Sequence, residues 1–277
     1  MKFILIGHGS IGSRYKDSLI KLGINKDEIY IVEKNNEIIS KLRSNGFKCY
    51  QDIKLIKDLK EFSTAGIVAN WGPDHMNSAN ELIDIGCKRM IIEKPISNSI
   101  KELNKFQDKA SKNNIFVTIH YHWQYTNLKQ TIKDLEINFE LGEPVGIRLF
   151  GGAVCLSTNG THYLDLACDL LQATPETVLA DLDIDYINPR DKSLAYIGGL
   201  ASYRMDNSTF IHVSFSNKNS QAIEAEIVYK HSLIKIGYEG TLSVFKRDQD
   251  SINKFGNKIT RYGELNLINE TIFKDPS

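Results

Sequence analysis

A glycine-rich turn near the N-terminus constrains the fold of this chain more than any other feature. A short apolar run at residues 3–6 leads into the turn, and an amphipathic segment follows it. The turn reads Gly7-His8-Gly9-Ser10-Ile11-Gly12, so the order is strand, Gly-x-Gly-x-x-Gly, helix. This order is the fingerprint of a βα turn that binds the pyrophosphate of a dinucleotide.

Each glycine of this turn is needed for a different structural reason. Gly7 allows a tight turn, Gly9 lets the backbone approach a pyrophosphate, and Gly12 lets the helix pack closely on the strand. The helix N-terminus then presents free N–H groups and its positive dipole end to the phosphates. We therefore predict that the cofactor contacts Gly7, Gly9, Ser10, Ile11 and Gly12. The alternative is a turn of the same kind in a protein that binds no dinucleotide.

An acidic residue at the end of the next apolar run bears on the choice of cofactor. Glu33 lies 21 positions after Gly12, where an acidic side chain accepts hydrogen bonds from the ribose hydroxyls of NAD. Its carboxylate would repel a 2′-phosphate, which favours NAD over NADP. The neighbouring Lys34 could pair with that phosphate, so NADP stays the less favoured alternative.

The N-terminal half alternates short apolar runs with amphipathic segments. This alternation is typical of βαβ units whose right-handed crossovers build a doubly wound parallel sheet. The runs that we expect to be strands are residues 3–6, 29–32, 66–69, 89–92 and 115–119, and helical patterns lie near residues 19–22, 38–42, 79–85 and 103–110.

The pattern changes after residue 121. A helix near 126–135 is followed by runs rich in β-branched and aromatic residues, and residues 161–171 carry a second helical pattern. Consecutive strands without helices between them favour an antiparallel or mixed sheet. The predicted strands are residues 145–150, 178–186, 195–204, 210–216, 222–229 and 233–238. We therefore predict an α/β protein with a Rossmann domain at residues 1–121. An α+β domain with a mostly antiparallel sheet, for substrate binding and oligomerisation, follows at residues 122–277.

Charge and apolar patterning narrow the range of partners. The 277-residue chain has 34 basic and 34 acidic side chains, so its net charge is zero. Binders of nucleic acids and membrane surfaces carry a basic excess. No apolar run approaches the roughly 20 residues of a membrane span, and the first one ends too early for a signal peptide. We expect a cytoplasmic protein with no nucleic-acid or membrane partner.

The four cysteines give no sign of metal or redox chemistry. They form no Cys-x-x-Cys pair and have no histidine at metal-ligand spacing. We expect structural free thiols and no metal at Cys49, Cys87, Cys155 and Cys168.

A second motif lies in residues 67–97. A strand ends in an Ala-Asn step, Pro-Asp-x-His opens a helix, and a glycine turn and another strand lead to Glu-Lys-Pro. The residues that carry this pattern are Asn70, Pro73, Asp74, His75, Gly86, Glu93, Lys94 and Pro95. The segment resembles the glucose–fructose oxidoreductase and inositol dehydrogenase (Gfo/Idh/MocA) family. The resemblance covers the N-terminal domain and, more loosely, the sheet-rich remainder.

The resemblance implies that Glu93 and Lys94 lie beside the nicotinamide ring of NAD, and that the Lys94–Pro95 bond is cis. Asn70, Trp71, Pro73 and His75 would be further cofactor contacts. Oxidation of a secondary alcohol releases a proton, so a group must manage it. A partly desolvated Lys94 next to a cationic nicotinamide would have a lowered pKa. The plainer interpretation is a solvated strand end at which Pro95 stops the strand.

Family members continue with a cluster that lines a sugar site. Here that place reads His120-Tyr121-His122-Trp123, and the histidines depart from the Asn and Arg of many relatives. The histidines could orient hydroxyls while Trp123 offers a flat face to a pyranose ring. Alternatively, Tyr121 and Trp123 belong to the core.

The segment Gly160-Thr161-His162-Tyr163-Leu164-Asp165 resembles the family's Gly-x-His-x-x-Asp entry to its active-site helix. Thr161 would be the N-cap, His162 would accept the substrate's proton, and Asp165 would orient the imidazole of His162. Relatives active on sugars usually carry Asp four residues before this histidine. Thr158 stands there instead, next to Asn159. We therefore include Thr158 and Asn159 among the predicted substrate-binding residues. The alternative for His162 is an ordinary histidine at the start of a helix.

These observations predict an NAD(P)-dependent oxidoreductase. It would transfer a hydride between nicotinamide and a hydroxyl or keto carbon of a sugar-like substrate, including a sugar nucleotide, with Lys94 and His162 handling the proton. The missing carboxylate at Thr158 leaves a second hypothesis, a dinucleotide-binding sensor without turnover. A different reduction on the same scaffold, of an imine or a linear tetrapyrrole, is a third. The resemblance also implies a homodimer or homotetramer formed through the C-terminal sheet.

Overall fold

The structure, a computed structural model, describes residues 1–56, 64–152, 155–184, 192, 196–218, 220–237, 240–255 and 263–273. The chain divides into two compact domains, residues 1–121 and 122–277. Each has its own sheet and its own hydrophobic core.

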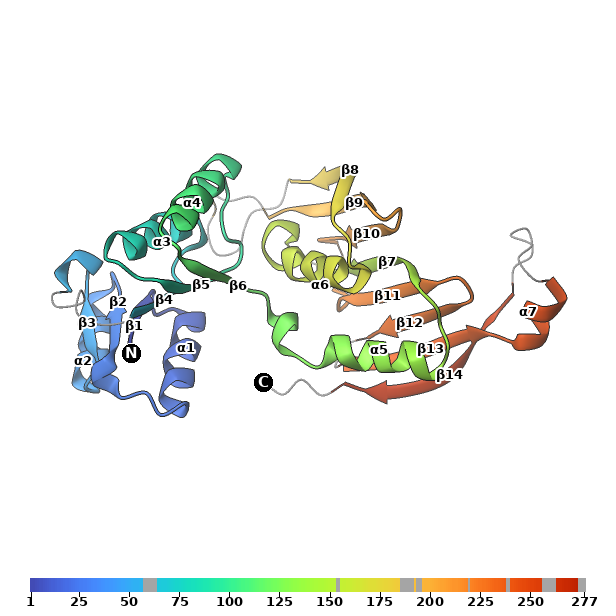
Figure 1. The fold of residues 1–277 in the computed structure, drawn as a ribbon, viewed down its shortest axis with the longest axis horizontal. Coiled ribbons are helices and arrows are strands. Elements are labelled where there is room, and N and C mark those ends of the chain that lie inside the picture. The colour runs from blue at the N-terminus through green and yellow to red at the C-terminus, as the bar shows by residue number, and fades with distance from the viewer. Residues whose placement is uncertain are drawn as a thin grey trace. The chain divides into compact units, whose positions relative to one another are not determined.

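The N-terminal domain is built on a six-stranded parallel sheet (Figure 1). Its strand order is β3-β2-β1-β4-β5-β6, so the direction of winding reverses beside β1. Ligands of open α/β sheets bind at such a switch point, outside the carboxyl ends of the strands. The strands are β1 (Lys2–Ile6), β2 (Ile29–Val32), β3 (Lys48–Tyr50), β4 (Thr64–Val68), β5 (Arg89–Glu93) and β6 (Phe116–His120).

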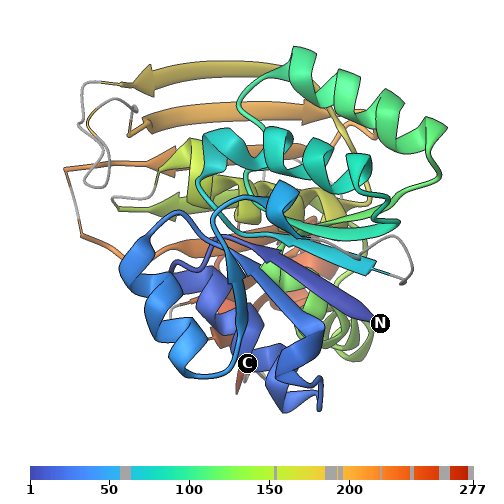
Figure 2. The same ribbon diagram turned by 90° about the vertical axis from the view of Figure 1, so that its left-hand side faces the viewer.

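Helices cover both faces of this sheet. Figure 2 shows α1 and α2, in blue, on one side, and α3 and α4, in teal to green, on the other. Leu19 and Ile39 pack into the core on the first face, and Leu82 and Phe106 pack into the core on the second. Because both faces are covered, β2 is buried at every position, and β1 and β4 are mainly apolar rather than alternating. The helices are α1 (Ser10–Lys21), α2 (Asn36–Ser44), α3 (His75–Asp84) and α4 (Ile100–Lys112), with short turns η1 (Lys26–Glu28), η2 (Ile53–Leu55) and η3 (Gly72–Asp74).

The C-terminal domain is built on an eight-stranded sheet of order β14-β13-β12-β11-β7-β10-β9-β8. Strands β7 and β10 pair in parallel at its centre, and every other neighbouring pair is antiparallel. The strands are β7 (Pro144–Gly151), β8 (Pro175–Asp183), β9 (Gly198–Met205), β10 (Phe210–Phe215), β11 (Glu224–Tyr229), β12 (Ser232–Ile236), β13 (Thr241–Arg247) and β14 (Leu265–Ile272).

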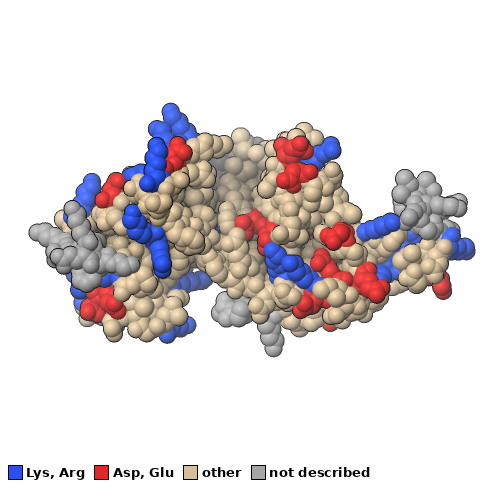
Figure 3. Space-filling model, viewed as in Figure 1, with Lys and Arg blue, Asp and Glu red and all other residues tan. Residues whose placement is uncertain are grey.

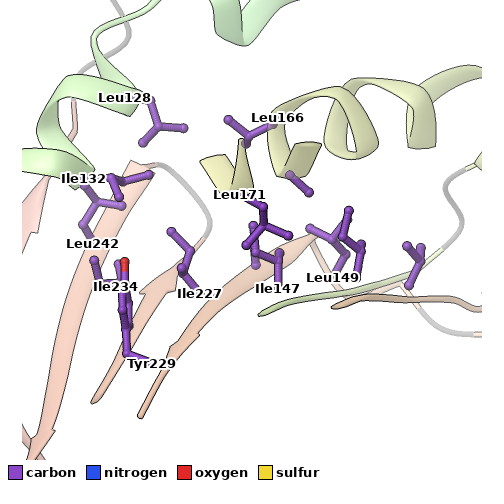
Figure 4. Close-up of a cluster of buried hydrophobic side chains, with 14 of the residues drawn as sticks. Leu128, Ile132, Ile147, Leu149, Leu166, Leu171, Ile227, Tyr229, Ile234 and Leu242 are labelled. Carbon is purple, nitrogen blue, oxygen red and sulfur yellow. The ribbon is translucent and has the colours of Figure 1, made fainter. Parts of the chain in front are cut away.

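Two helices pack on one face of this second sheet and form its core. Figure 4 shows Leu128 and Ile132 of α5, and Leu166 of α6, pointing toward Ile147 and Ile227 of the sheet. The opposite face is open: Leu179, Phe150 and Leu200 are exposed there. The elements outside the sheet are η4 (His122–Tyr125), α5 (Leu128–Asn138), the π-helical turn η5 (Leu156–Gly160), α6 (Thr161–Leu171) and α7 (Gln249–Phe255).

The predicted fold class is confirmed in both domains. Parts of the predicted strands 178–186, 195–204 and 233–238 lie outside the described residues. Strands β3, β13 and β14 and helix α7 were not among the predicted elements.

Basic and acidic side chains are interspersed on the face that Figure 3 shows, as the zero net charge suggests. Within the described segments, no helix is both long and apolar enough to cross a membrane. The four cysteines are free thiols, three of them buried and Cys168 half-buried.

Candidate functional site

The glycine turn joins β1 to α1 in the way that the fingerprint requires. Gly7 has φ +89°, a conformation that a residue with a side chain rarely adopts. A Cβ on Gly7 would also lie 2.5 Å from the Cα of Asn70. A Cβ on Gly12 would collide with the backbone of Gly7, at 2.9 Å from its carbonyl carbon and closer still to its oxygen. Both glycines therefore hold the turn against β4 and the first turn of α1.

Gly9 differs from its neighbours because a Cβ on it would meet no described atom within 4 Å. It precedes α1 as N-cap residue without a side-chain cap, and the first turn of α1 carries no acidic residue. The N–H groups of this helix end, including those of Ser10 and the 39% exposed Ile11, could thus bind an anion, since no acidic residue of the first turn competes for them. An open backbone and an uncapped helix start fit a pyrophosphate.

Glu33 is held at the carboxyl end of β2 by two backbone amides. The N–H of His8 donates to Oε2 of Glu33 (2.8 Å), and the N–H of Asn35 donates to Oε1 (2.9 Å). The carboxylate is therefore fixed beside the glycine turn and has lone pairs left for further donors. Lys34 points into solvent, and its Nζ lies 3.5 Å from the carboxylate of Asp74.

The loop after β4 brings a buried amide next to the glycine turn. Asn70 donates from Nδ2 to Oγ of Ser78 (2.9 Å), and its buried Oδ1 has no hydrogen-bond partner among the described residues. Trp71 is 43% exposed and Pro73 is exposed. An unsatisfied buried acceptor next to an exposed ring fits a site that a polar ligand completes.

His75 takes a different place from the other residues predicted to contact the cofactor. It is only 2% exposed, with Nδ1 at 2.9 Å from the carbonyl oxygen of Pro95 and Nε2 at 3.2 Å from that of Asn70. The side chain links the loops after β4 and β5. Its predicted contact with the cofactor stays a prediction. The Lys94–Pro95 peptide bond is cis, as expected.

A buried carboxylate lies at the carboxyl end of β5. Glu93 is 7% exposed, and its Oε1 accepts hydrogen bonds from the hydroxyl of Tyr15 (2.9 Å) and from Nδ1 of His120 (2.7 Å). Burial works to raise the pKa of Glu93, but these two bonds and the charges of His120 and Lys94 leave that pKa below its usual value. The half-buried Lys94 follows directly.

The C-terminal domain holds the aromatic part of the predicted substrate set. The ring of Trp123 lies 5.0 Å from that of His122 and 6.2 Å from that of Tyr163, centroid to centroid. Trp123 also packs against the hydrophobic core of this domain. Trp123 is nevertheless only partly buried. Its ring can therefore serve the core, a sugar site or both.

The predicted N-cap of α6 is wrong. The helical run already begins in η5, Gly160 has helical dihedral angles, and the hydroxyl of Thr161 donates back to the carbonyl oxygen of Thr158 (2.7 Å). Thr161 thus lies inside a continuous helical segment. His162 follows it in the first turn of α6 and is half-buried, as is Thr158, while Asn159 is exposed.

Asp165 lies one turn further along α6. Its carboxylate accepts hydrogen bonds from the amide of Gln124 at 3.1 and 3.3 Å. Burial raises the pKa of Asp165 above its usual value, the bond from Gln124 lowers it, and the charge of Asp169 raises it further. The role in orienting His162 stays a prediction.

The structure gathers the predicted residues into two groups, one in each domain. The glycine turn, Glu33, the loop after β4, Glu93, Lys94, His120 and Tyr121 belong to the first; residues 122–123, 158–159, His162 and Asp165 belong to the second. Sequence reasoning missed Tyr15 and Gln124. Tyr15 lies four residues before the buried Leu19, so helical spacing indicated that it faces the sheet. No sequence signal indicated its partner.

Residues 1–121 match the family model GFO_IDH_MocA, described as an oxidoreductase family with an NAD-binding Rossmann fold. The glycine turn, the uncapped helix start and the fixed Glu33 agree with this match. The sequence of residues 1–121 is thus similar to the NAD-binding domain of the Gfo/Idh/MocA oxidoreductases. Among curated proteins, none matches the sequence.

Solved structures share the fold of the whole chain. UDP-N-acetylglucosamine 3-dehydrogenase GnnA from Acidithiobacillus ferrooxidans matches with a TM-score of 0.72 at 14% identity, covering 100% of this chain and 84% of GnnA. The WlbA dehydrogenase from Bordetella pertussis, in complex with NADH and UDP-GlcNAcA, matches at 0.69 and 15%, covering 85% and 76%. A super-repressor mutant of Gal80p from Saccharomyces cerevisiae matches at 0.73 and 12%, covering 100% and 81%.

Proposed function

We propose that the chain is a nicotinamide-dependent dehydrogenase that acts on a hydroxyl or keto carbon of a sugar-like substrate, including a sugar nucleotide. The observation that carries the proposal is the linkage of Glu93 to the phosphate cradle. Glu93, next to Lys94, is hydrogen-bonded to Tyr15 of α1, the helix whose N-terminus faces the pyrophosphate site. A lysine at the carboxyl end of β5 is thereby tied to the dinucleotide-binding turn.

The printed descriptions of two matched structures support the substrate class. GnnA is a UDP-N-acetylglucosamine 3-dehydrogenase, and WlbA was crystallised with UDP-GlcNAcA. Both act on or bind a sugar joined to UDP, and both share this fold. We infer that a UDP-linked amino sugar is the first substrate class to test.

The chemistry assigned to this chain's residues is the handling of one proton. When bound, the cofactor supplies the acceptor or donor of a hydride. Lys94 holds the substrate oxygen through its ammonium group, and its charge stabilises an alkoxide as the proton leaves. The imidazole of His162 exchanges that proton, and the aromatic side chain of Trp123 positions the sugar ring.

The test is turnover of UDP-linked sugars with NAD⁺, followed at the NADH absorbance band. We expect Lys94→Ala to lower kcat by about 100-fold or more, because it removes the positioned ammonium group. The matched control is Lys101→Ala, which truncates an exposed lysine on α4 and should leave turnover unchanged. Full activity of the Lys94 variant on the true substrate would overturn this mechanism.

NAD is the proposed cofactor, with NADP as the alternative. The carboxylate of Glu33 is fixed by the N–H groups of His8 and Asn35, so it cannot turn away from a 2′-phosphate without losing both bonds. Lys34, the group that could pair with that phosphate, lies next to Asp74. We expect NADH to bind at least tenfold more tightly than NADPH in a fluorescence titration, and equal affinities would contradict the assignment.

A second candidate is a dinucleotide-binding sensor or regulatory protein. It is favoured by Thr158, because relatives active on sugars usually carry a carboxylate at this place. Tight NADH binding without turnover of any sugar nucleotide in the panel would support this candidate against the dehydrogenase.

We also propose that the open face of the C-terminal sheet joins copies of the chain into a homodimer or homotetramer. Phe150, Leu179 and Leu200 share this face through the register of β7, β10, β9 and β8, and they are 45, 81 and 55% exposed. Exposed apolar side chains on one sheet face are typical of an interface.

A further inference from the structure

His120 stands where many relatives carry Asn or Arg, and its side chain contacts a buried carboxylate in the N-terminal domain. In the sheet, His120 at the end of β6 is the direct neighbour of Glu93 at the end of β5. The 2.7 Å bond between Nδ1 and Oε1 joins the two side chains. The pair therefore lies at the carboxyl edge of the sheet, where open α/β sheets bind their ligands.

The hydrogen bonds fix the protonation pattern of this pair. The pKa of Glu93 is lowered, so the side chain is an ionised carboxylate that only accepts. The hydroxyl of Tyr15 and Nδ1 of His120 must then both donate to it. A neutral His120 with its proton on Nδ1 carries its lone pair on Nε2, which is the tautomer that can take a proton from a hydroxyl.

Tyr15 strengthens the arrangement from a second element. It comes from α1, and its ring lies 5.6 Å from that of His120 in an edge-on contact. The imidazole is thus held by Glu93 on one side and by Tyr15 across its ring, while its side chain stays 34% exposed. A carboxylate behind an imidazole stabilises the imidazolium that forms when the ring is protonated.

We propose, on the basis of the dehydrogenase function proposed above, that His120 is a further catalytic base, with Glu93 and Tyr15 as its positioning residues. His120, supported by the carboxylate of Glu93, accepts the proton. Thr158 stands where relatives usually carry Asp, and it offers no carboxylate for this purpose. In the oxidation, the O–H bond of the substrate breaks and its proton goes to Nε2 of His120, which here takes the role given above to His162. The C–H hydrogen leaves with its electron pair to the oxidised nicotinamide, and the carbonyl forms. Lys94, next to Glu93, holds the oxygen.

Among the described contacts, Glu93 of β5 and Tyr15 of α1 lie against His120. The two side chains predict different effects of their substitution. Glu93→Gln replaces an acceptor-only carboxylate with an amide that can also donate, so the preference for the proton on Nδ1 should be lost. Tyr15→Phe leaves the carboxylate in place, so the Nδ1–H tautomer should be kept.

The first experiment needs no substrate. Imidazole ¹H–¹⁵N NMR spectra of the full chain across pH, with His120 assigned from the His120→Gln variant, report which nitrogen is protonated and at what pH. We expect the Nδ1–H tautomer in the wild type and in Tyr15→Phe, and its loss in Glu93→Gln. An Nε2–H tautomer in the wild type, or an unchanged tautomer in a folded Glu93→Gln variant, would overturn the proposal, because a merely structural link would change stability alone.

The second experiment is the pH profile of kcat/KM with NAD⁺ and a UDP-linked sugar. His120→Gln should lower kcat by about 100-fold or more and remove the low-pH limb, and added imidazole should partly restore His120→Ala. The control is His231→Gln, between β11 and β12. A fully active His120→Gln beside an inactive His162→Gln would assign the base to His162 and overturn this inference alone. A wild-type chain that turns over no sugar would overturn the proposed function as well.

Discussion

The second and third glycines of the N-terminal turn, Gly9 and Gly12, offer a test in which the same substitution to alanine has opposite consequences. In Gly12→Ala the new methyl group would meet backbone atoms of Gly7, which cannot rotate away as a side chain could. In Gly9→Ala the methyl group enters space that is open within 4 Å, on a residue whose φ of −73° suits alanine. The first change strains the fold and the second leaves it intact.

The size of the first effect follows from the collision. Overpacking costs about 1–3 kcal/mol and sometimes more, and a clash with backbone belongs at the upper end because α1 must move away from β1. For a domain of residues 1–121, an unfolding entropy near 2 cal/mol/K per residue converts 1 kcal/mol into about 4 °C. We expect Gly12→Ala to lower the Tm of the N-terminal domain by about 10 °C.

Gly9→Ala should have the same Tm as the wild type or a slightly higher one, since alanine restricts the unfolded chain by about 0.4–1 kcal/mol. Its methyl group occupies the approach to the pyrophosphate. We expect NADH affinity to fall at least tenfold, about 1.4 kcal/mol. Differential scanning fluorimetry without cofactor and a NADH titration separate the two variants. Unchanged NADH binding by Gly9→Ala would show that the pyrophosphate does not lie against this turn.

Three further predictions test packing, electrostatics and assembly. Ile132→Ala, at a fully buried position of α5, should destabilise the chain by about 2–5 kcal/mol, whereas Ile137→Ala on the same helix, at 73% exposure, should cost under about 0.5 kcal/mol in urea unfolding. Glu93→Gln should destabilise the chain at pH 7; because the folded-state pKa of Glu93 lies below its usual 4.5, this difference should shrink as the pH falls below about 4.5. A difference that is constant in pH would contradict that origin. Phe150→Glu should convert the oligomer to monomers in light scattering, and an unchanged mass would exclude this face.

The sequence predicted the parts of the molecule that depend on local spacing. The glycine turn and the Glu-Lys-Pro step carry their meaning within a few residues, and the alternation of apolar runs indicated the parallel sheet. Strand β3 has only three residues, and β14 contains polar residues because it is an exposed edge. Neither has a pattern that distinguishes it from a loop.

The remaining features depend on contacts between distant segments. The bond from Tyr15 to Glu93 joins residues 78 positions apart, and only the packing of α1 on the sheet brings them together. The predicted cap at Thr161 failed for a related reason. Gly160 suggested a break, but the preceding π-helical turn continues into α6 and leaves no cap position at Thr161.

The parallel pairing of β7 with β10 has a consequence for how the C-terminal domain is made. The first strand of that sheet, β7 (Pro144–Gly151), is also a central one, and its two neighbours are β10 (Phe210–Phe215) and β11 (Glu224–Tyr229). Pairing over such sequence separation closes long loops and is slow. During synthesis β7 must therefore wait for more than fifty residues before either partner leaves the ribosome. The N-terminal domain is complete by then, so it folds first, while α5 and α6 keep their apolar faces without a sheet to cover them.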